Sequence, residues 1–169
     1  PAAGDAGGSL GAALALWYDN QSNDRNVNHK DDMKGSYLGP EFTQTEIEKE
    51  LNSIGAKFDI LDYENLISQT SDHLSNEKAI GWFQGRMEFG PRALGNRSII
   101  GSPILEETRS IINSKVKMRP SYQPFCPSIL EEERERLFEN SFSHKHMAIA
   151  FRMKEEFIKD LPCAVHVDG

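Results

Sequence analysis

The 169-residue sequence contains only two cysteines, Cys126 and Cys163, and they do not share a CxxC motif. A disulfide framework or a cysteine-ligated metal site needs more cysteines at closer spacing, so the sequence predicts neither. No apolar run approaches the ~20 residues that a membrane-spanning helix requires. The first residues also lack the basic-then-apolar layout of a signal peptide. Together these absences predict a reduced, cytoplasmic protein.

An initiator methionine is absent as well, and the sequence opens in the middle of a pattern, which predicts a piece of a longer protein. The length favours one domain with room for a core. With 38% hydrophobic and 27% charged residues, the composition is typical of a globular chain.

Positive charge is scarce in the chain as a whole, whose net charge is −7, but it is concentrated between residues 78 and 130. That segment holds eight Lys or Arg and three Glu, a balance of +5, which leaves −12 for the remainder. Long polyanions are repelled by an acidic surface, so a local basic segment indicates a site for a small anion more than a nucleic-acid surface.

Within the basic segment, Arg86, Arg92 and Arg97 lie among three glycines and a proline, directly after the apolar run 79–83. A guanidinium pairs two oxygens at once and keeps its charge near neutral pH. Glycine lets the backbone approach a ligand and adopt positive φ. The pattern predicts a strand that runs into a phosphate or carboxylate site, to which Asn96 and Ser98 add neutral hydrogen bonds.

The alternative for this cluster is a set of surface arginines paired with Glu88 and other acids. A second basic group, Lys115, Lys117 and Arg119, lies at the end of a predicted helix, where interaction with the helix dipole explains it without a ligand. Three prolines follow and indicate a rigid path.

Weaker signals lie elsewhere. Residues 4–9 form a predicted glycine-rich turn before a helix, a pattern that can hold phosphate. His144 and His146 are either metal ligands or exposed loop residues, and no third partner is in view. Trp17 and Trp82 fall in apolar stripes and are predicted to lie in the core.

The order of predicted elements alternates helices and strands, which indicates an α/β class, or α+β with a mixed sheet. The organisation predicted is 1–18, a linker at 19–36, and a main domain at 37–169. Helices are predicted from residue 10 to 18, after Thr43, after Asp62 and over 105–117. Strands or extended segments are predicted at 57–61, 78–84, 99–102, 125–130, 147–153 and 164–167.

The run 81–98, with the downstream residues Asn113 and Lys115 and the segment 123–130, resembles the C-terminal region of the carbamoyltransferases of antibiotic and nodulation biosynthesis. That family shows a GWFQGRxExGPRALGxRSI block and then RPFAPSVL. Here Gln123 stands for the arginine and Cys126 for the alanine. Residues 1–7, 36–40 and 164–169 match further family segments, so the resemblance omits only 19–35.

The resemblance implies a large N-terminal actin/Hsp70-like (Kae1-like) domain followed by a YrdC-like α/β domain, a twisted open sheet with flanking helices. Residues 1–18 would be the tail of the first domain, and 37–169 the second, truncated at its C-terminus.

The resemblance also implies the chemistry of a bacterial O-carbamoyltransferase. The YrdC-like part would join carbamoyl phosphate and ATP, assisted by Mg²⁺, into carbamoyl-adenylate. The Kae1-like part, which holds iron, would pass the carbamoyl group to a hydroxyl of a small molecule. The residues that the resemblance assigns to phosphates and nucleotide are Arg86, Arg92, Arg97, Ser98, Asn113, Lys115, Arg119 and Ser128. Asp5 would bind the iron only in the full-length enzyme, and the piece alone is not expected to complete transfer.

The competing hypothesis is a non-catalytic YrdC-like module that binds an anion or RNA. The overall acidity argues against RNA. The sequence shows no clear Ser/His or Cys/His pair, which fits the adenylation that the resemblance implies, because that reaction requires no nucleophile from the protein.

Overall fold

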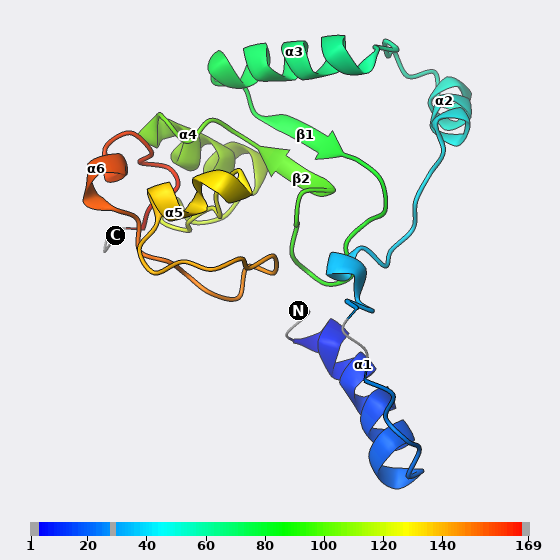
Figure 1. The fold of residues 1–169 in the computed structure, drawn as a ribbon. Coiled ribbons are helices and arrows are strands. Elements are labelled where there is room, and N and C mark those ends of the chain that lie inside the picture. The colour runs from blue at the N-terminus through cyan, green and yellow to red at the C-terminus, as the bar shows by residue number, and fades with distance from the viewer. Residues whose placement is uncertain (1–3, 28–29, 167–169) are drawn as a thin grey trace.

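The computed structural model describes residues 4–27 and 30–166, and Figure 1 gives their path. The elements in chain order are α1 (Asp5–Ala15), its π-helical continuation η1 (Leu16–Asn20), the 3₁₀ turn η2 (Lys34–Ser36), α2 (Gln44–Ser53), α3 (Tyr63–Ser75), β1 (Ile80–Phe83), β2 (Arg97–Ile100), α4 (Glu106–Ile111), its π-helical continuation η3 (Ile112–Val116), η4 (Glu131–Glu133), α5 (Arg134–Leu137) and α6 (Glu155–Ile158).

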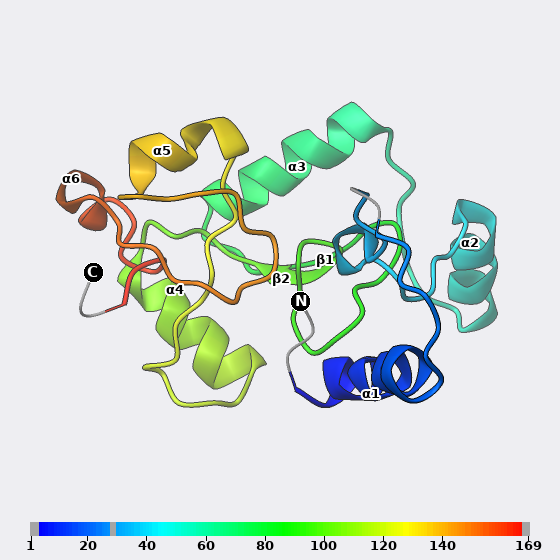
Figure 2. The same ribbon diagram turned by 60° about the horizontal axis from the view of Figure 1, so that its bottom comes forward.

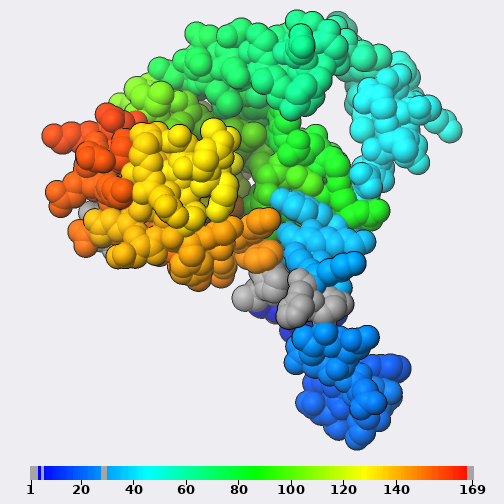
Figure 3. Space-filling view, viewed as in Figure 1, coloured from blue at the N-terminus to red at the C-terminus, as the bar shows by residue number. Residues whose placement is uncertain are grey.

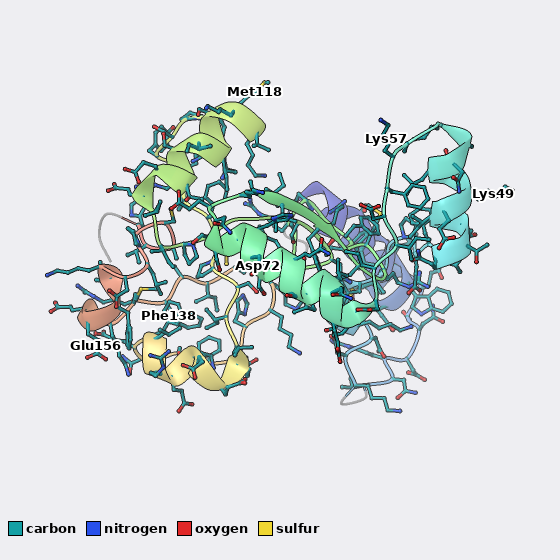
Figure 4. All side chains as sticks on the ribbon, turned by 90° about the horizontal axis from the view of Figure 1, so that it is seen from above. Lys49, Lys57, Asp72, Met118, Phe138 and Glu156 are labelled. Carbon is teal, nitrogen blue, oxygen red and sulfur yellow. The ribbon has the colours of Figure 1, made fainter. Side chains whose placement is uncertain are left out.

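The sheet consists of β1 and β2, paired antiparallel with Ile80 opposite Ile100 and Phe83 opposite Arg97. Helix α3 lies along this hairpin in two views (Figures 1 and 4). A single antiparallel bridge joins Phe138 to Met153. Helices with a small antiparallel sheet confirm the predicted α/β class in its coarse form.

Helix starts were predictable because their signals are local. Thr43 and Glu46 form a reciprocal capping box at the start of α2, with 2.8 Å from the Thr43 amide nitrogen to Glu46 Oε2. Asp62 accepts a hydrogen bond from the Asn65 amide at 2.8 Å and caps α3. Gly55, with φ of 66°, follows the last turn of α2 as expected. These predictions are confirmed.

Several strand predictions are wrong. Residues 57–61, 147–152 and 164–166 pair with no strand, and Met153 makes only its one bridge. Residues 125–130 are irregular, and residue 167 lies outside the described residues. Strand propensity reports fit to a pleated, half-buried surface, so an apolar run without a partner does not become a strand. The predicted turn at 4–9 is also wrong, because α1 already begins at Asp5.

Large apolar side chains are exposed on the helices that project from the body. Helix α1 extends away from the rest (Figures 1 and 3), and α2 stands apart from α3 and the hairpin (Figures 2 and 3). Trp17 is 52% exposed and Ile54 69% exposed, so the prediction that Trp17 lies in the core is wrong for this chain. Trp82 is half-buried. The apolar side chains that are buried are Ile112, Leu137, Met153, Cys163 and Val165.

Within the described ranges, none of the helices combines the length and the apolar character needed to cross a membrane.

Candidate anion-binding site

The arginine loop, defined here as residues 84–97, leads from the end of β1 to Arg97, the first residue of β2. Its glycines all have positive φ, 57° at Gly85, 111° at Gly90 and 108° at Gly95. A side chain would strain the backbone at these values, so glycine is what permits the sharp bends. The predicted strand and the glycine-rich, arginine-bearing turn after it are both present in the structure.

Glu88 lies inside this loop, with its side chain fully buried. Its Oε1 accepts hydrogen bonds from three amides, those of Leu94 at 2.6 Å, Asn96 at 2.9 Å and Arg97 at 3.2 Å. Its Oε2 is buried, accepts no hydrogen bond from the described residues, and lies 3.6 Å from Arg97 Nε. The buried carboxylate therefore fixes the main chain of residues 94–97, the last part of the loop. The alternative that Glu88 is a surface ion-pair partner of the arginines is therefore wrong in one respect, since its side chain is buried.

The pKa of Glu88 is affected by two opposing causes. Burial raises it, and the hydrogen bonds from the Leu94, Asn96 and Arg97 amides lower it further than burial raises it, so the net pKa lies below the ordinary value of 4.5. A depressed folded-state pKa contributes stability that is present above the unfolded-state pKa. That stability is lost as the pH falls through the folded-state value. The loop should therefore be intact at neutral pH and loosen only in acid.

The three arginines differ in what they bind. Arg86 donates to the Gly39 carbonyl at 2.9 Å and pairs with Glu41 at 3.5 Å, yet its side chain is 49% exposed. Arg97 donates to the Gly90 carbonyl at 3.2 Å and faces Glu88. Arg92 is exposed and has no hydrogen-bond or ion-pair partner in residues 4–27 and 30–166. Two arginines thus brace the loop, and the third is available to an external anion.

Ser98 follows the loop on β2 and accepts a hydrogen bond from the Gly95 amide at 3.2 Å. Asn96 donates to the Arg86 carbonyl at 2.8 Å. Both side chains therefore help to close the loop, and the assignment of Ser98 to a phosphate stays a prediction.

Residues 36–40 are an irregular segment that is joined to the loop by main-chain hydrogen bonds. Gly39 and Met87 are joined by a 2.9 Å hydrogen bond from the Gly39 amide, and Phe89 donates to the Ser36 carbonyl at 2.6 Å. The Tyr37 hydroxyl donates to the Leu94 carbonyl at 2.8 Å. Residues 36–40 and the arginine loop, which match the family at separate places in the sequence, are therefore one structural unit.

Gly39→Ala is expected to disrupt this unit, because a Cβ at Gly39 would lie 2.9 Å from both the Met87 Cβ and the Met87 carbonyl oxygen. Main-chain atoms cannot yield as a flexible side chain does. We expect a loss of about 2–3 kcal/mol in the free energy of unfolding. Denaturant unfolding measures it. Gly11→Ala, where the added Cβ meets nothing within 4 Å, is the control. Equal stability of the two variants would contradict the pairing.

The second basic group is built around Asn113, whose residue is 0% exposed. Its Nδ2 donates to the Ser121 and Gln123 carbonyls at 3.2 and 2.8 Å, and its Oδ1 accepts from Arg119 Nε at 2.6 Å. The Arg119 guanidinium also lies 4.8 Å from the ring centre of Phe125. Asn113 and Arg119 thus fix the turn after η3, and their assignment to ligand stays a prediction.

Lys115 and Lys117 are exposed on and just after η3, without a partner among the described residues. Ser128 is exposed as well. Within the described ranges, no hydrogen bond or ion pair joins this group to the arginine loop. The structure therefore places the predicted residues in two groups, in which Arg92, Lys115 and Lys117 have no hydrogen-bond or ion-pair partner among the residues that the structure describes.

The histidines do not form a metal centre with their neighbours, since no group of three His, Cys, Asp or Glu in the described residues could hold a metal ion. His144 Nε2 accepts from the Ala148 amide at 3.1 Å. His146 Nδ1 lies 3.5 Å from the buried Ser36 hydroxyl, and burial lowers its pKa. A shallow hollow elsewhere, between α6 and Glu139, is lined mostly by carboxylates and contains none of the predicted site residues.

Comparison with known proteins identifies the family. The family described as carbamoyltransferase C-terminus matches residues 71–169, more than half of the chain, so this chain belongs to that family. The matched segment contains the whole arginine loop and the second basic group.

Relatives extend the match over the whole chain. An uncharacterized protein of Methanocaldococcus jannaschii is 47% identical in an alignment that spans 100% of this chain and 28% of that protein. Nodulation protein NolO of Bradyrhizobium diazoefficiens is 39% identical, over 100% of this chain and 31% of its own. A 3'-hydroxymethylcephem-O-carbamoyltransferase of Streptomyces clavuligerus is 37% identical over 59% of this chain and 18% of its own length. The chain thus spans less than a third of these relatives, whose sources are archaeal and bacterial.

Proposed function

We propose that this chain is the part of an O-carbamoyltransferase that binds ATP and carbamoyl phosphate, forms carbamoyl-adenylate, and supplies it for transfer to a hydroxyl of a small molecule. The observation that carries the proposal is Arg92, an exposed cation without a partner in the described residues, on a loop braced by Glu88. The names of the relatives support the reaction class, since one relative is a cephem O-carbamoyltransferase.

The proposed reaction concentrates negative charge. For carbamoyl-adenylate to form, a carbamoyl oxygen must bond to the α-phosphorus of ATP, pyrophosphate must leave, and the phosphate of carbamoyl phosphate must leave as inorganic phosphate through reaction with water. Fixed cations aimed at these oxygens stabilise charge that develops in the transition state. In this proposal Arg92 contacts the phosphate of carbamoyl phosphate, and Lys115 and Lys117 contact the phosphates of ATP. Their lack of internal partners supports these roles.

Arg86 and Arg97 are proposed to support Arg92, with Arg86 also within reach of a ligand because half of its side chain is exposed. Ser98 and Ser128 would add hydroxyl hydrogen bonds. Mg²⁺ would enter with the nucleotide, since it commonly binds through one or two carboxylates and substrate phosphates.

The chain is also proposed to work joined to a Kae1-like domain, with the chain itself YrdC-like. The exposed apolar residues of α1 and α2 support this, because a partner domain would cover them. Asp5 is proposed as an iron ligand of that domain, but its side chain lies outside the described atoms. The acceptor would then bind mainly in the partner domain.

Thermal unfolding of the full-length protein with ATP and carbamoyl phosphate tests the binding step. A ligand at 100 times its Kd adds about 2.7 kcal/mol of stability, which is a rise of several degrees in melting temperature. We expect each ligand to raise the melting temperature. No rise at millimolar concentrations of both would overturn the proposal, and RNA binding that weakens steeply with salt would favour the non-catalytic alternative.

The double variant Lys115→Gln, Lys117→Gln is expected to raise the KM for ATP about tenfold, because two charges that face the polyphosphate are removed. Both side chains are exposed and unpaired, so the melting temperature should change by no more than about 1 °C. Initial rates at varied ATP measure the effect. The matched control removes Lys49, which is exposed on α2, and Lys57, which is exposed after it (Figure 4), and it should leave the KM unchanged. Equal KM values for the two variants would contradict the assignment.

A further inference from the structure

Three amides of the arginine loop converge on one oxygen. The N–H groups of Leu94, Asn96 and Arg97 all point at Glu88 Oε1, at 2.6, 2.9 and 3.2 Å. Amides of neighbouring residues that converge in this way form the kind of cup with which proteins bind phosphate or carboxylate. In this chain the cup is filled by the protein's own carboxylate.

We propose that Glu88 is a positioning residue that acts as an internal substitute anion. It fills the amide cup of the arginine loop before any ligand arrives, and so presets the loop that carries Arg92. The proposed substrate phosphates would then meet the Arg92 side chain on the outer side of the loop and not these amides. The role of Arg92 rests on the proposed function, whereas the filled cup stands on the contacts of Glu88 alone.

The surroundings of Glu88 require its charge and not only its shape. Oε1 faces three N–H donors, and Oε2 faces the Arg97 guanidinium at 3.6 Å. Glutamine has nearly the same volume, but one of its two ends is an NH₂ group that would have to face these donors. A buried donor that faces donors is unsatisfied and costly. Glu88→Gln should therefore be impaired in spite of its conservative size.

The loop is held at two places on either side of Arg92. Before it, the Phe89 amide donates to the Ser36 carbonyl at 2.6 Å. After it, the Leu94 amide donates a hydrogen bond to Glu88, and the Leu94 carbonyl accepts one from the Tyr37 hydroxyl at 2.8 Å. Removing the carboxylate leaves the second anchor held by the Tyr37 hydroxyl alone and leaves the Leu94, Asn96 and Arg97 amides without their shared acceptor. The expected consequence is a misplaced Arg92, which weakens phosphate binding without touching the ligand directly.

Variants of the full-length protein test the proposal through the KM for carbamoyl phosphate. We expect Glu88→Ala and Glu88→Gln each to raise it about ten- to a hundredfold. Formate or acetate at about 50 mM should enter the vacated cup of Glu88→Ala and lower its KM for carbamoyl phosphate at least part of the way to the wild-type value. The same anions should not change the KM of the wild type. The control is Glu106→Ala, which removes an exposed carboxylate 3.5 Å from Arg109. A Glu88→Gln variant with wild-type kinetics would overturn the proposal, as would the absence of any carboxylate rescue in a folded Glu88→Ala variant.

Hydrogen exchange on the wild-type protein tests whether Glu88 or the ligand fills the cup, even if the variants do not fold. With residue resolution, the amides of Leu94, Asn96 and Arg97 should be protected without ligand, and saturating carbamoyl phosphate should not change their rates. Amides that are unprotected alone and become protected with carbamoyl phosphate would overturn the proposal, because the ligand would then fill the cup. Protected amides in a protein that no ligand stabilises would support the role of Glu88 and contradict the proposed function, so the two failures are distinguishable.

Discussion

Arg92→Ala is expected to lower kcat/KM for carbamoyl transfer by the full-length protein about 10²- to 10³-fold. Loss of one preorganised donor to developing charge has effects of this order. The melting temperature should stay within about 1 °C of the wild type, since Arg92 is exposed and has no partner among the described residues. Steady-state kinetics and thermal unfolding of the same preparation measure both effects.

Two further variants sharpen this prediction. Arg92→Lys keeps the charge but loses the planar fork, so it should recover only part of the rate. Arg25→Ala removes an arginine that is also exposed and without a described partner but lies far from the loop in sequence, and it should have no effect on either quantity. An Arg92→Ala enzyme with wild-type kcat/KM would refute the assignment of this residue.

Asn113→Ala is expected to cost about 2–4 kcal/mol in the free energy of unfolding, which lowers the melting temperature by about 5–15 °C. The change removes two donors and one acceptor from a fully buried position. The Ser121 and Gln123 carbonyls and the Arg119 guanidinium lose these partners. Denaturant and thermal unfolding measure the loss.

Ser114→Ala is the control for Asn113, because it removes a neighbouring exposed hydroxyl that donates only to carbonyls of its own helical turn. It should change the stability by less than about 0.5 kcal/mol. If Asn113→Ala keeps wild-type stability and loses only ligand affinity, the internal role of Asn113 is contradicted and its predicted role as a ligand contact is favoured.

The features that could be predicted from the sequence are local ones. The capping box of Thr43 and Glu46 and the cap at Asp62 lie within four residues, so sequence spacing alone specifies them. The bends at Gly90 and Gly95 are local as well, because only glycine adopts those φ values freely. For the same reason the arginine loop was recognisable as a shaped turn.

What could not be predicted depends on partners distant in sequence. The pairing of Gly39 with Met87 spans nearly fifty residues, and no local pattern specifies it. The strands predicted at 57–61 and 147–153 fail because nothing pairs with them over their length. The division of the arginines into two that brace and one that is free likewise depends on where Glu88 lies. One signal was available: between residues 86 and 98, Glu88 is the single acid among three arginines.

The most direct test of the proposed function is to follow the fate of ATP when the full-length protein activates carbamoyl phosphate. With ATP, Mg²⁺ and labelled carbamoyl phosphate, and without acceptor, we expect pyrophosphate release and a labelled carbamoyl-adenylate detectable by mass spectrometry. Both products should require both substrates and should be lost in Arg92→Ala. Transfer that proceeds without ATP, or that converts ATP to ADP, would contradict the account.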